Sequence, residues 1–165
     1  MIKKIEGIVI SEKTFKESSK LINILTEEGV ISLIAKGAKS LKSELRSTTT
    51  KLTVGDFTYY DKNKGLSTLT SADLKNSYKN IKKDIEQISY ASYLLDLAEQ
   101  VSKESDSKDI YKLLISSLNK IEEGFDPFVI TNILELKYLD YLGVMPQLDS
   151  CSICGKKDSI VTLSY

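Results

Sequence analysis

Short apolar runs separated by turn-forming residues fill the first part of the chain, up to about residue 75. In one of these runs, Ile31, Leu33 and Ala35 alternate with the side chains between them. Alternation of this kind, bounded by polar and glycine-containing turns, is typical of β-strands. The predicted strands cover residues 5–10, 21–25, 30–35, 57–60 and 66–72.

These strands predict a small barrel. A tight turn at residues 27–29 (Glu-Glu-Gly) joins the second strand to the third, and a turn at residues 63–65 (Asn-Lys-Gly) precedes the fifth. Five short strands on this scale suit a closed or nearly closed barrel. An oligonucleotide-binding (OB) barrel and a five-stranded SH3-like barrel are both compatible with the pattern.

From Tyr78 onward the apolar positions recur every three or four residues, which predicts amphipathic helices at residues 81–101, 110–121 and 128–142. Residues 105–107 (Ser-Asp-Ser) can cap the second helix and Gly124 ends it, while Asp126 followed by Pro127 opens the third. The third helix is apolar on nearly every side. It is therefore predicted to be the central, most buried helix.

The resulting fold class is α+β, with a barrel at residues 1–77 and a helical domain at residues 78–165. The helical domain ends in a cysteine knuckle, which a short strand-like run at residues 160–163 follows. No Pro or Gly lies at the boundary near residue 78, so the two parts are expected to pack firmly.

The composition restricts the function. The 165-residue chain has no His, so Ser-His, Cys-His and His-metal catalytic sites are excluded within it. No apolar run reaches the roughly 18 residues that a membrane span needs, and no secretory signal opens the chain. The expected compartment is the cytoplasm, where the cysteines stay reduced.

Positive charge is concentrated in the first half of a chain whose net charge is zero. Residues 1–80 carry 14 Lys and Arg against 9 Asp and Glu, whereas residues 81–165 carry 9 against 14. This asymmetry indicates a polyanionic partner for the first half, with a chance distribution over solvated faces as the alternative.

The densest positive segment is residues 36–51, in which five cations face Glu44 alone. It follows the third strand, so we expect a loop that extends from the barrel and contacts a phosphate backbone. A mobile, solvated loop is the alternative. The candidate DNA-binding residues are Lys36, Lys39, Lys42, Arg46 and Lys51.

Aromatic residues in and beside the barrel are candidates for stacking on bases. They are Phe15, Phe57, Tyr59, Tyr60 and Tyr78. Strand alternation sends Phe57 and Tyr59 to one face and Tyr60 to the other, so one set must be core. Most of these rings are expected to be structural, and the pattern does not choose between them.

Cys151 and Cys154 form a CxxCG knuckle, which is half of a zinc ribbon. Zinc takes four ligands, and the chain has no other Cys and no His. We expect a split or truncated zinc site, ahead of a redox pair, which would need a following helix, and ahead of two buried thiols without a role. The predicted function requires no cofactor.

These pieces, in this order, resemble the RecO family of bacterial recombination mediators. The most specific match is the run that leads into the CxxCG knuckle. The matching residues are 6–9 (EGIV), 17–21 (ESSKL), 25–26 (LT) with Gly29, 35–39 (AKGAK), 42–43 (KS), 66–69 (LSTL), 90–97 (YASYLLDL) and 142–151 (LGVMPQLDSC).

The resemblance implies an N-terminal OB-fold barrel and a helical domain with a zinc ribbon. It also implies a nucleoid-associated, non-enzymatic protein of DNA damage repair and DNA recombination. Such a protein binds single- and double-stranded DNA, anneals strands, and contacts the single-strand-binding protein and a RecR partner to help load recombinase.

Two departures from the family pattern affect these expectations. Family members usually continue past this point and supply a second CxxC, so the chain looks like a fragment or an early stop. Zinc binding by Cys151 and Cys154 is therefore expected only in a longer protein. The basic segment is rich in lysine where relatives often use arginine, which is expected to weaken specific contacts.

Two rival functions stay open. The first is a protein-interaction module that docks a partner peptide on its helical domain and has little DNA affinity of its own. The second is a redox enzyme that works through Cys151 and Cys154.

Overall fold

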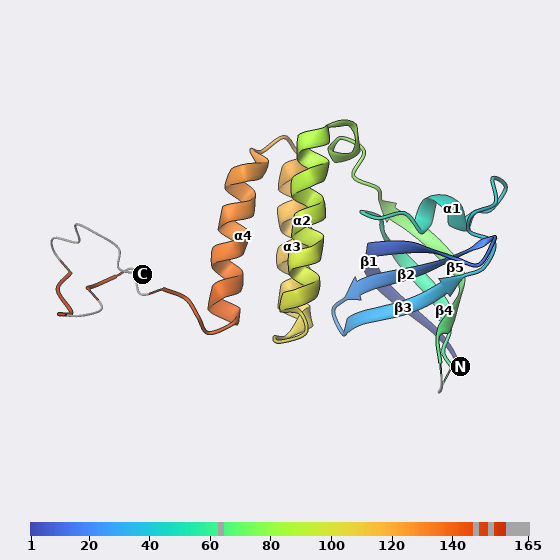
Figure 1. Cartoon of the computed structure of the whole chain (residues 1–165), viewed down its shortest axis with the longest axis horizontal. Coiled ribbons are helices and arrows are strands. Elements are labelled where there is room, and N and C mark those ends of the chain that lie inside the picture. Colours follow the sequence, from blue (N-terminus) through green and yellow to red (C-terminus); the bar gives the residue numbers. More distant parts are fainter. Residues whose placement is uncertain (63–64, 147–148, 152–153, 158–165) are drawn as a thin grey trace.

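A five-stranded barrel is followed by three long helices in the computed structural model of the chain, as Figure 1 shows. The structure describes residues 1–62, 65–146, 149–151 and 154–157. The strand predicted at residues 160–163 lies outside the described residues, as do Asn63 and Lys64 of the predicted turn before the fifth strand.

The barrel strands are β1 (Ile2–Phe15), β2 (Ser19–Thr26), β3 (Gly29–Ala35), β4 (Val54–Tyr60) and β5 (Ser67–Asn76). They close in the order β1-β2-β3-β5-β4. Every neighbouring pair is antiparallel except β3 and β5, which run parallel. This is the topology of an OB-fold barrel, so the SH3-like alternative is wrong. All five predicted strands are confirmed, and each is longer than or shifted from its apolar run.

One tight turn and two strand glycines fit this closure. The predicted turn at residues 27–29 is confirmed, since Thr26 pairs with Gly29, whose φ is +120°. A Cβ on Gly7 would lie 2.7 Å from the carbonyl oxygen of Leu25, and one on Gly55 would lie 2.6 Å from that of Asp73. Glycine in these strands therefore permits the close approach of neighbouring backbones.

The helices are η1 (Ile81–Lys83, a 3-10 turn), α2 (Ile85–Val101), α3 (Ser107–Glu122) and α4 (Pro127–Tyr141). Asp106 and Asp126 accept hydrogen bonds from backbone N–H groups of the first turns of α3 and α4, as predicted. The single helix predicted from residue 81 is wrong. Asp84 adopts an extended backbone and caps α2, so Ile85 is 84% exposed instead of lying on the apolar face.

The connection between barrel and helices is fastened to the end of α3. The backbone N–H groups of Asn80 and Ile81 donate to the carboxylate of Glu122, each over 3.0 Å. The hydroxyl of buried Tyr78 donates to Oδ1 of Asn119 over 3.1 Å. These contacts tie a connection of few residues to a helix that also packs on the barrel.

Two clusters of buried apolar side chains hold the molecule together. The first fills the barrel and comprises Val9, Ile22, Ile24, Leu33, Ala35, Ala38, Phe57, Tyr59 and Leu69. The second is shared, because it joins barrel residues such as Ile8, Ile10 and Leu25 to helical residues such as Leu94 and Leu114. Strand alternation explains the division, since Val9 points into the barrel while Ile8 and Ile10 point toward the helices.

Helix α4 is not central, which corrects the prediction from its composition. It packs against α2 and α3, on the side away from the barrel (Figure 1). Ile130, Leu134 and Tyr138 face inward and are buried, whereas Phe128 and Ile133 are about half exposed. Because α2 packs on β1 and α3 packs on β2, α4 does not reach the barrel and has one buried face and one open face.

Buried tyrosines make the stability of the fold depend on alkaline pH. The Tyr138 hydroxyl donates to the carbonyl oxygen of Ile110 over 3.1 Å, and burial raises the pKa of this phenol above its ordinary value. Its neutral form therefore contributes stability that is fully present below pH 10, the usual tyrosine pKa, and is lost as pH rises above it.

We expect the free energy of unfolding to fall less steeply above pH 10 in Tyr138→Phe than in the unchanged chain. One titrating phenol contributes about 1.4 kcal/mol per pH unit to that slope. Urea unfolding at several values between pH 8 and 11.5 measures it. Parallel curves for the two proteins would contradict the burial of this hydroxyl.

Candidate nucleic-acid interface

The basic segment folds back over one end of the barrel. Ala38 is fully buried in the barrel cluster, and Leu45, the first residue of the short helix α1 (Leu45–Thr48), packs against it. Helix α1 also packs against β5. The predicted loop is thus anchored to the barrel at both ends by an apolar side chain, while its middle part, around Leu41, is exposed.

Local hydrogen bonds give this segment a defined path. Successive turns connect Ser40 to Gly37, Ser43 to Ser40, and Arg46 to Ser43 through N–H···O bonds of 3.0 to 3.1 Å. Gly37 has a φ of +68°, the left-handed region that favours glycine. The N–H of Lys39 donates to the carbonyl oxygen of Ser18 over 3.1 Å, which ties the segment to the β1–β2 turn.

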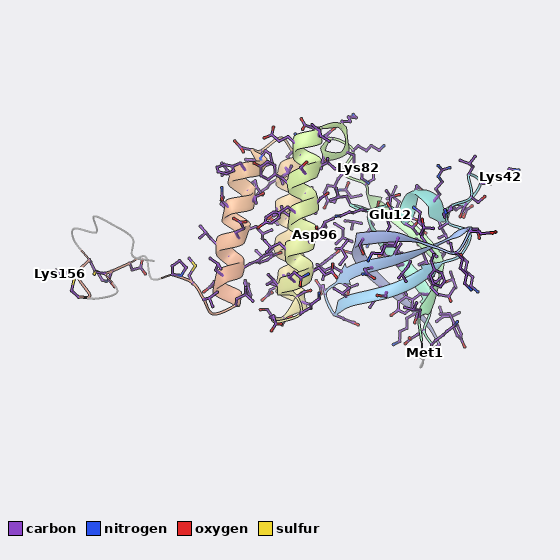
Figure 2. All side chains as sticks on the ribbon, in the orientation of Figure 1. Met1, Glu12, Lys42, Lys82, Asp96 and Lys156 are labelled. Atoms are coloured by element: carbon purple, nitrogen blue, oxygen red, sulfur yellow. The ribbon has the colours of Figure 1, made fainter. Side chains whose placement is uncertain are left out.

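Four of the five candidate residues lie exposed along this path. They are Lys36, Lys39, Lys42 and Arg46. None of the four makes an ion pair with any residue that the structure describes. Figure 2 shows Lys42 at the extremity of the barrel, on the side away from the helices. Their charge is therefore open to solvent and to a ligand.

Lys51 has a different environment from the other four. Its Nζ lies 3.4 Å from Oδ1 of Asp96 on α2, and its side chain is 32% exposed. Its backbone N–H also donates to Oε1 of Glu12 over 3.4 Å. The structure thus turns Lys51 toward the helices and gives it a carboxylate partner, so it does not join the open group.

Lys13 and Lys16 were missed by the sequence reasoning. Both are exposed, and Lys16 opens the turn between β1 and β2 with a φ of +58°. Because Ser18 in the same turn accepts from Lys39, these cations lie beside the basic segment. The pairing of the first two strands could have revealed them, because it brings this turn to the end of the barrel where β3 finishes.

The candidate aromatic residues separate by burial. Phe57, Tyr59 and Tyr78 are buried, so the prediction that most rings are structural is confirmed. Tyr60 is 50% exposed on the opposite face of β4, as alternation predicts. Phe15 is partly exposed at the end of β1, and the Nζ of Lys16 lies 5.6 Å from the centroid of its ring.

Two backbone hydrogen bonds link the described residues of the cysteine knuckle. The N–H of Gly155 donates to the carbonyl oxygen of Cys151 over 2.8 Å, and that of Cys151 donates to Lys156 over 2.9 Å. In the described part of the chain, no group of three or more Cys, His, Asp and Glu gathers that could hold a metal ion. Two thiols alone do not fit the four-ligand set of a structural zinc.

A groove lies between α2 and α4, away from the barrel. This groove, of about 370 Å³, is lined by side chains that include Tyr90, Tyr93, Phe128 and Thr131. The Tyr93 hydroxyl donates to Oε1 of Glu135 over 2.5 Å. The hydroxyl of Thr131, a buried residue, has no hydrogen-bond partner among the described residues. The groove therefore combines aromatic walls with an unused polar group.

Known proteins resemble the chain along most of its length. The family model for the N-terminal part of Recombination protein O matches residues 1–78, and the model for its C-terminal part matches residues 82–165. DNA repair protein RecO of Listeria monocytogenes serotype 4b is 38% identical over 157 residues, which is 94% of this chain and 61% of the relative.

Two further relatives give the same picture. DNA repair protein RecO of Halalkalibacterium halodurans is 37% identical over 166 residues, covering 99% of this chain and 65% of the relative. That of Exiguobacterium sibiricum is 35% identical over 161 residues, covering 96% and 64%. The chain thus spans about three fifths of the length of these relatives, from 61% to 65%.

The folded parts agree with this family assignment. The first family match covers the barrel strands, and the second covers the three long helices. None of the helices in the described residues has the length and apolar character that a bilayer crossing requires. The chain belongs to the RecO family of DNA repair proteins.

Proposed function

We propose that this chain is a DNA-binding adaptor in recombinational repair, which binds single- and double-stranded DNA without sequence preference. The observation that carries the proposal is a group of exposed cations, Lys36, Lys39, Lys42 and Arg46, at one end of an OB-fold barrel, with no ion-pair partner among the described residues. Barrels of this type bind oligonucleotides, and flexible cations along a groove follow a phosphate backbone.

The residue types support binding that ignores sequence. Lys36, Lys39 and Lys42 are point charges, which neutralise phosphates without the planar fork that reads base edges. Arg46 is the only arginine. Contacts to phosphates position a protein on DNA but carry no sequence information directly. A protein with this set of cations therefore has little means to prefer one sequence.

Strand annealing follows from the same cations and needs no catalytic residue. Two complementary strands repel each other through their phosphates, and bound cations lower that repulsion while the bases stay accessible. We propose that the adaptor acts in this way, without enzymatic chemistry, in the cytoplasm at the nucleoid. The single-strand-binding protein and a RecR-like protein would be its partners when recombinase is loaded.

The test is the salt dependence of binding to a fluorescent single-stranded oligonucleotide, read as anisotropy. If about four phosphates are neutralised, the logarithm of the association constant falls with the logarithm of salt concentration at a slope near −3. Oligonucleotides of unrelated sequence should give the same slope. Binding that is independent of salt would contradict the proposal, as would strong preference for one sequence.

A second function is favoured by the groove between α2 and α4. Its aromatic walls suit the apolar end of a partner peptide. In this case the chain is a docking module with little DNA affinity. Absent DNA binding at low salt, together with saturable binding of an acidic peptide with a hydrophobic end, would select this function over the first.

The cysteine knuckle enters the proposal only as half of a metal site. Cys151 and Cys154 would supply two of the four zinc ligands, and two more would have to come from outside the described residues. No step of DNA binding depends on them. Replacing both with serine should leave the salt slope unchanged.

A further inference from the structure

Burial leaves two candidate rings for contact with a base, and they lie at opposite ends of β1. Tyr60 pairs with Ile2, beside the chain start. Phe15 is the last residue of β1 and pairs with Ser19 across the β1–β2 turn. Figure 2 places Met1 and Lys42 at separate corners of the barrel. Only Phe15, of these two, lies beside the basic segment.

The ring of Phe15 lies outside the two apolar cores. It is partly exposed and belongs to neither the barrel cluster nor the shared cluster. Phe57 and Tyr59, by comparison, are part of the barrel cluster and are buried. An aromatic ring that is partly open to solvent, outside both clusters and at the end of a strand, can offer its open part to a ligand.

Two cations belong to the same turn or are tied to it. Lys16 follows Phe15 in a left-handed conformation, with a φ of +58°, and its Nζ lies 5.6 Å from the ring centroid. Lys39 is fixed to the same turn, because its N–H donates to the carbonyl oxygen of Ser18 over 3.1 Å. The turn therefore combines an aromatic ring with nearby charges that can contact phosphates.

We propose that Phe15 is a stacking platform for an unpaired base, and that it gives this end of the barrel a preference for single-stranded over double-stranded DNA. The inference rests on the proposed DNA binding. Aromatic side chains stack on any base, so the platform adds affinity without sequence preference. In a duplex both faces of each base are covered by its neighbours, so the ring of Phe15 gains nothing there.

The first test compares Phe15→Leu with the unchanged chain by anisotropy. Loss of one stacked base lowers single-strand affinity by roughly 10-fold and leaves duplex affinity within about twofold. The salt slope stays the same, because no phosphate contact is removed. Tyr60→Leu is the matched control, an exposed ring at the other end of β1, and it should bind as the unchanged chain does.

The second test uses the absence of tryptophan from the chain. Phe15→Trp introduces a single tryptophan, whose emission, excited selectively beyond the tyrosine band, should be quenched when a single-stranded oligonucleotide stacks on it and much less by a duplex. Tyr60→Trp should show no such quenching. Because Trp preserves an aromatic face, Phe15→Trp should also keep the affinity that Phe15→Leu loses.

The outcomes separate this inference from the proposed function. If the unchanged chain binds DNA with the expected salt slope, but Phe15→Leu binds equally well and Phe15→Trp is not quenched, the stacking role is overturned alone. If the unchanged chain binds no DNA at low salt, both fail together. An equal loss of single-strand and duplex affinity in Phe15→Leu also overturns the platform, since it would indicate a general change of the turn.

Discussion

Replacing Lys39 and Lys42 together with glutamate is expected to weaken single-strand binding by at least about 25-fold in 0.1 M salt. Each phosphate contact contributes about 0.7 to the salt slope for single strands, so two lost contacts correspond to about 1.4 logarithmic units at that concentration. The two new carboxylates add repulsion. Both lysines are exposed and belong to the open group of cations on the barrel end. Anisotropy titrations at several salt concentrations measure the loss.

The slope distinguishes local contact from a general effect of charge. In the double variant it should fall from near −3 to about −1.4. Lys108→Glu combined with Lys137→Glu is the matched control, since it makes the same change in net charge at exposed positions on α3 and α4. Equal losses in the two double variants would show that net charge, and not this surface, determines affinity.

Leu94→Ala is expected to lower the free energy of unfolding by about 3–4 kcal/mol, because it removes a large side chain from a packed core. Leu94 is completely buried in the shared cluster that joins α2 to the barrel. Domains of this kind have a total stability of about 5–15 kcal/mol, so the variant loses a large share of it. The melting temperature should fall by about 10 °C.

Ile85→Ala is the control for this loss, because Ile85 lies on the same helix with 84% of its surface exposed. It should change stability by less than about 0.5 kcal/mol. Urea unfolding followed by far-UV and near-UV circular dichroism measures both variants. The shared cluster also predicts one transition for barrel and helices. Two separate transitions, or equal effects of the two variants, would contradict it.

The barrel could be predicted well because each of its strands contains a recognisable apolar run. What the runs could not show is where a strand ends in polar residues. Lys13 and Thr14 belong to β1, yet they carry no apolar signal. Strand order was equally hidden, since the parallel pairing of Leu33 with Ser67 joins positions that are distant in sequence. A choice between barrel types needed that pairing.

The helices show two different limits. In a helix that is apolar on nearly all sides, such as α4, the sequence pattern does not indicate which face is buried. Burial of the whole helix was therefore predicted, whereas the structure leaves one face open. At the start of α2 the information was present. Asp84 is a good capping residue, but the periodicity that begins at Ile81 was given more weight than the cap.

The positions of the cations were readable from the sequence, but their surroundings were not. Lys51 differs from Lys42 only because Asp96, which is 45 positions away, meets it across the interface with α2. Lys16 lies 20 positions before the basic segment in sequence, although the β1–β2 turn brings it to that segment in space. Both outcomes depend on tertiary contacts that no local pattern contains.

The fastening of the barrel to α3 has a consequence for any partner in the groove. The basic end and the α2–α4 groove lie on opposite sides of a shared core, and Glu122 holds the connection between them. The span from the basic end to the groove is therefore fixed by the fold. A partner bound to the same DNA gains effective concentration at the groove only if its own linker matches that span. The length of the linker can therefore select partners independently of the residues that contact the groove.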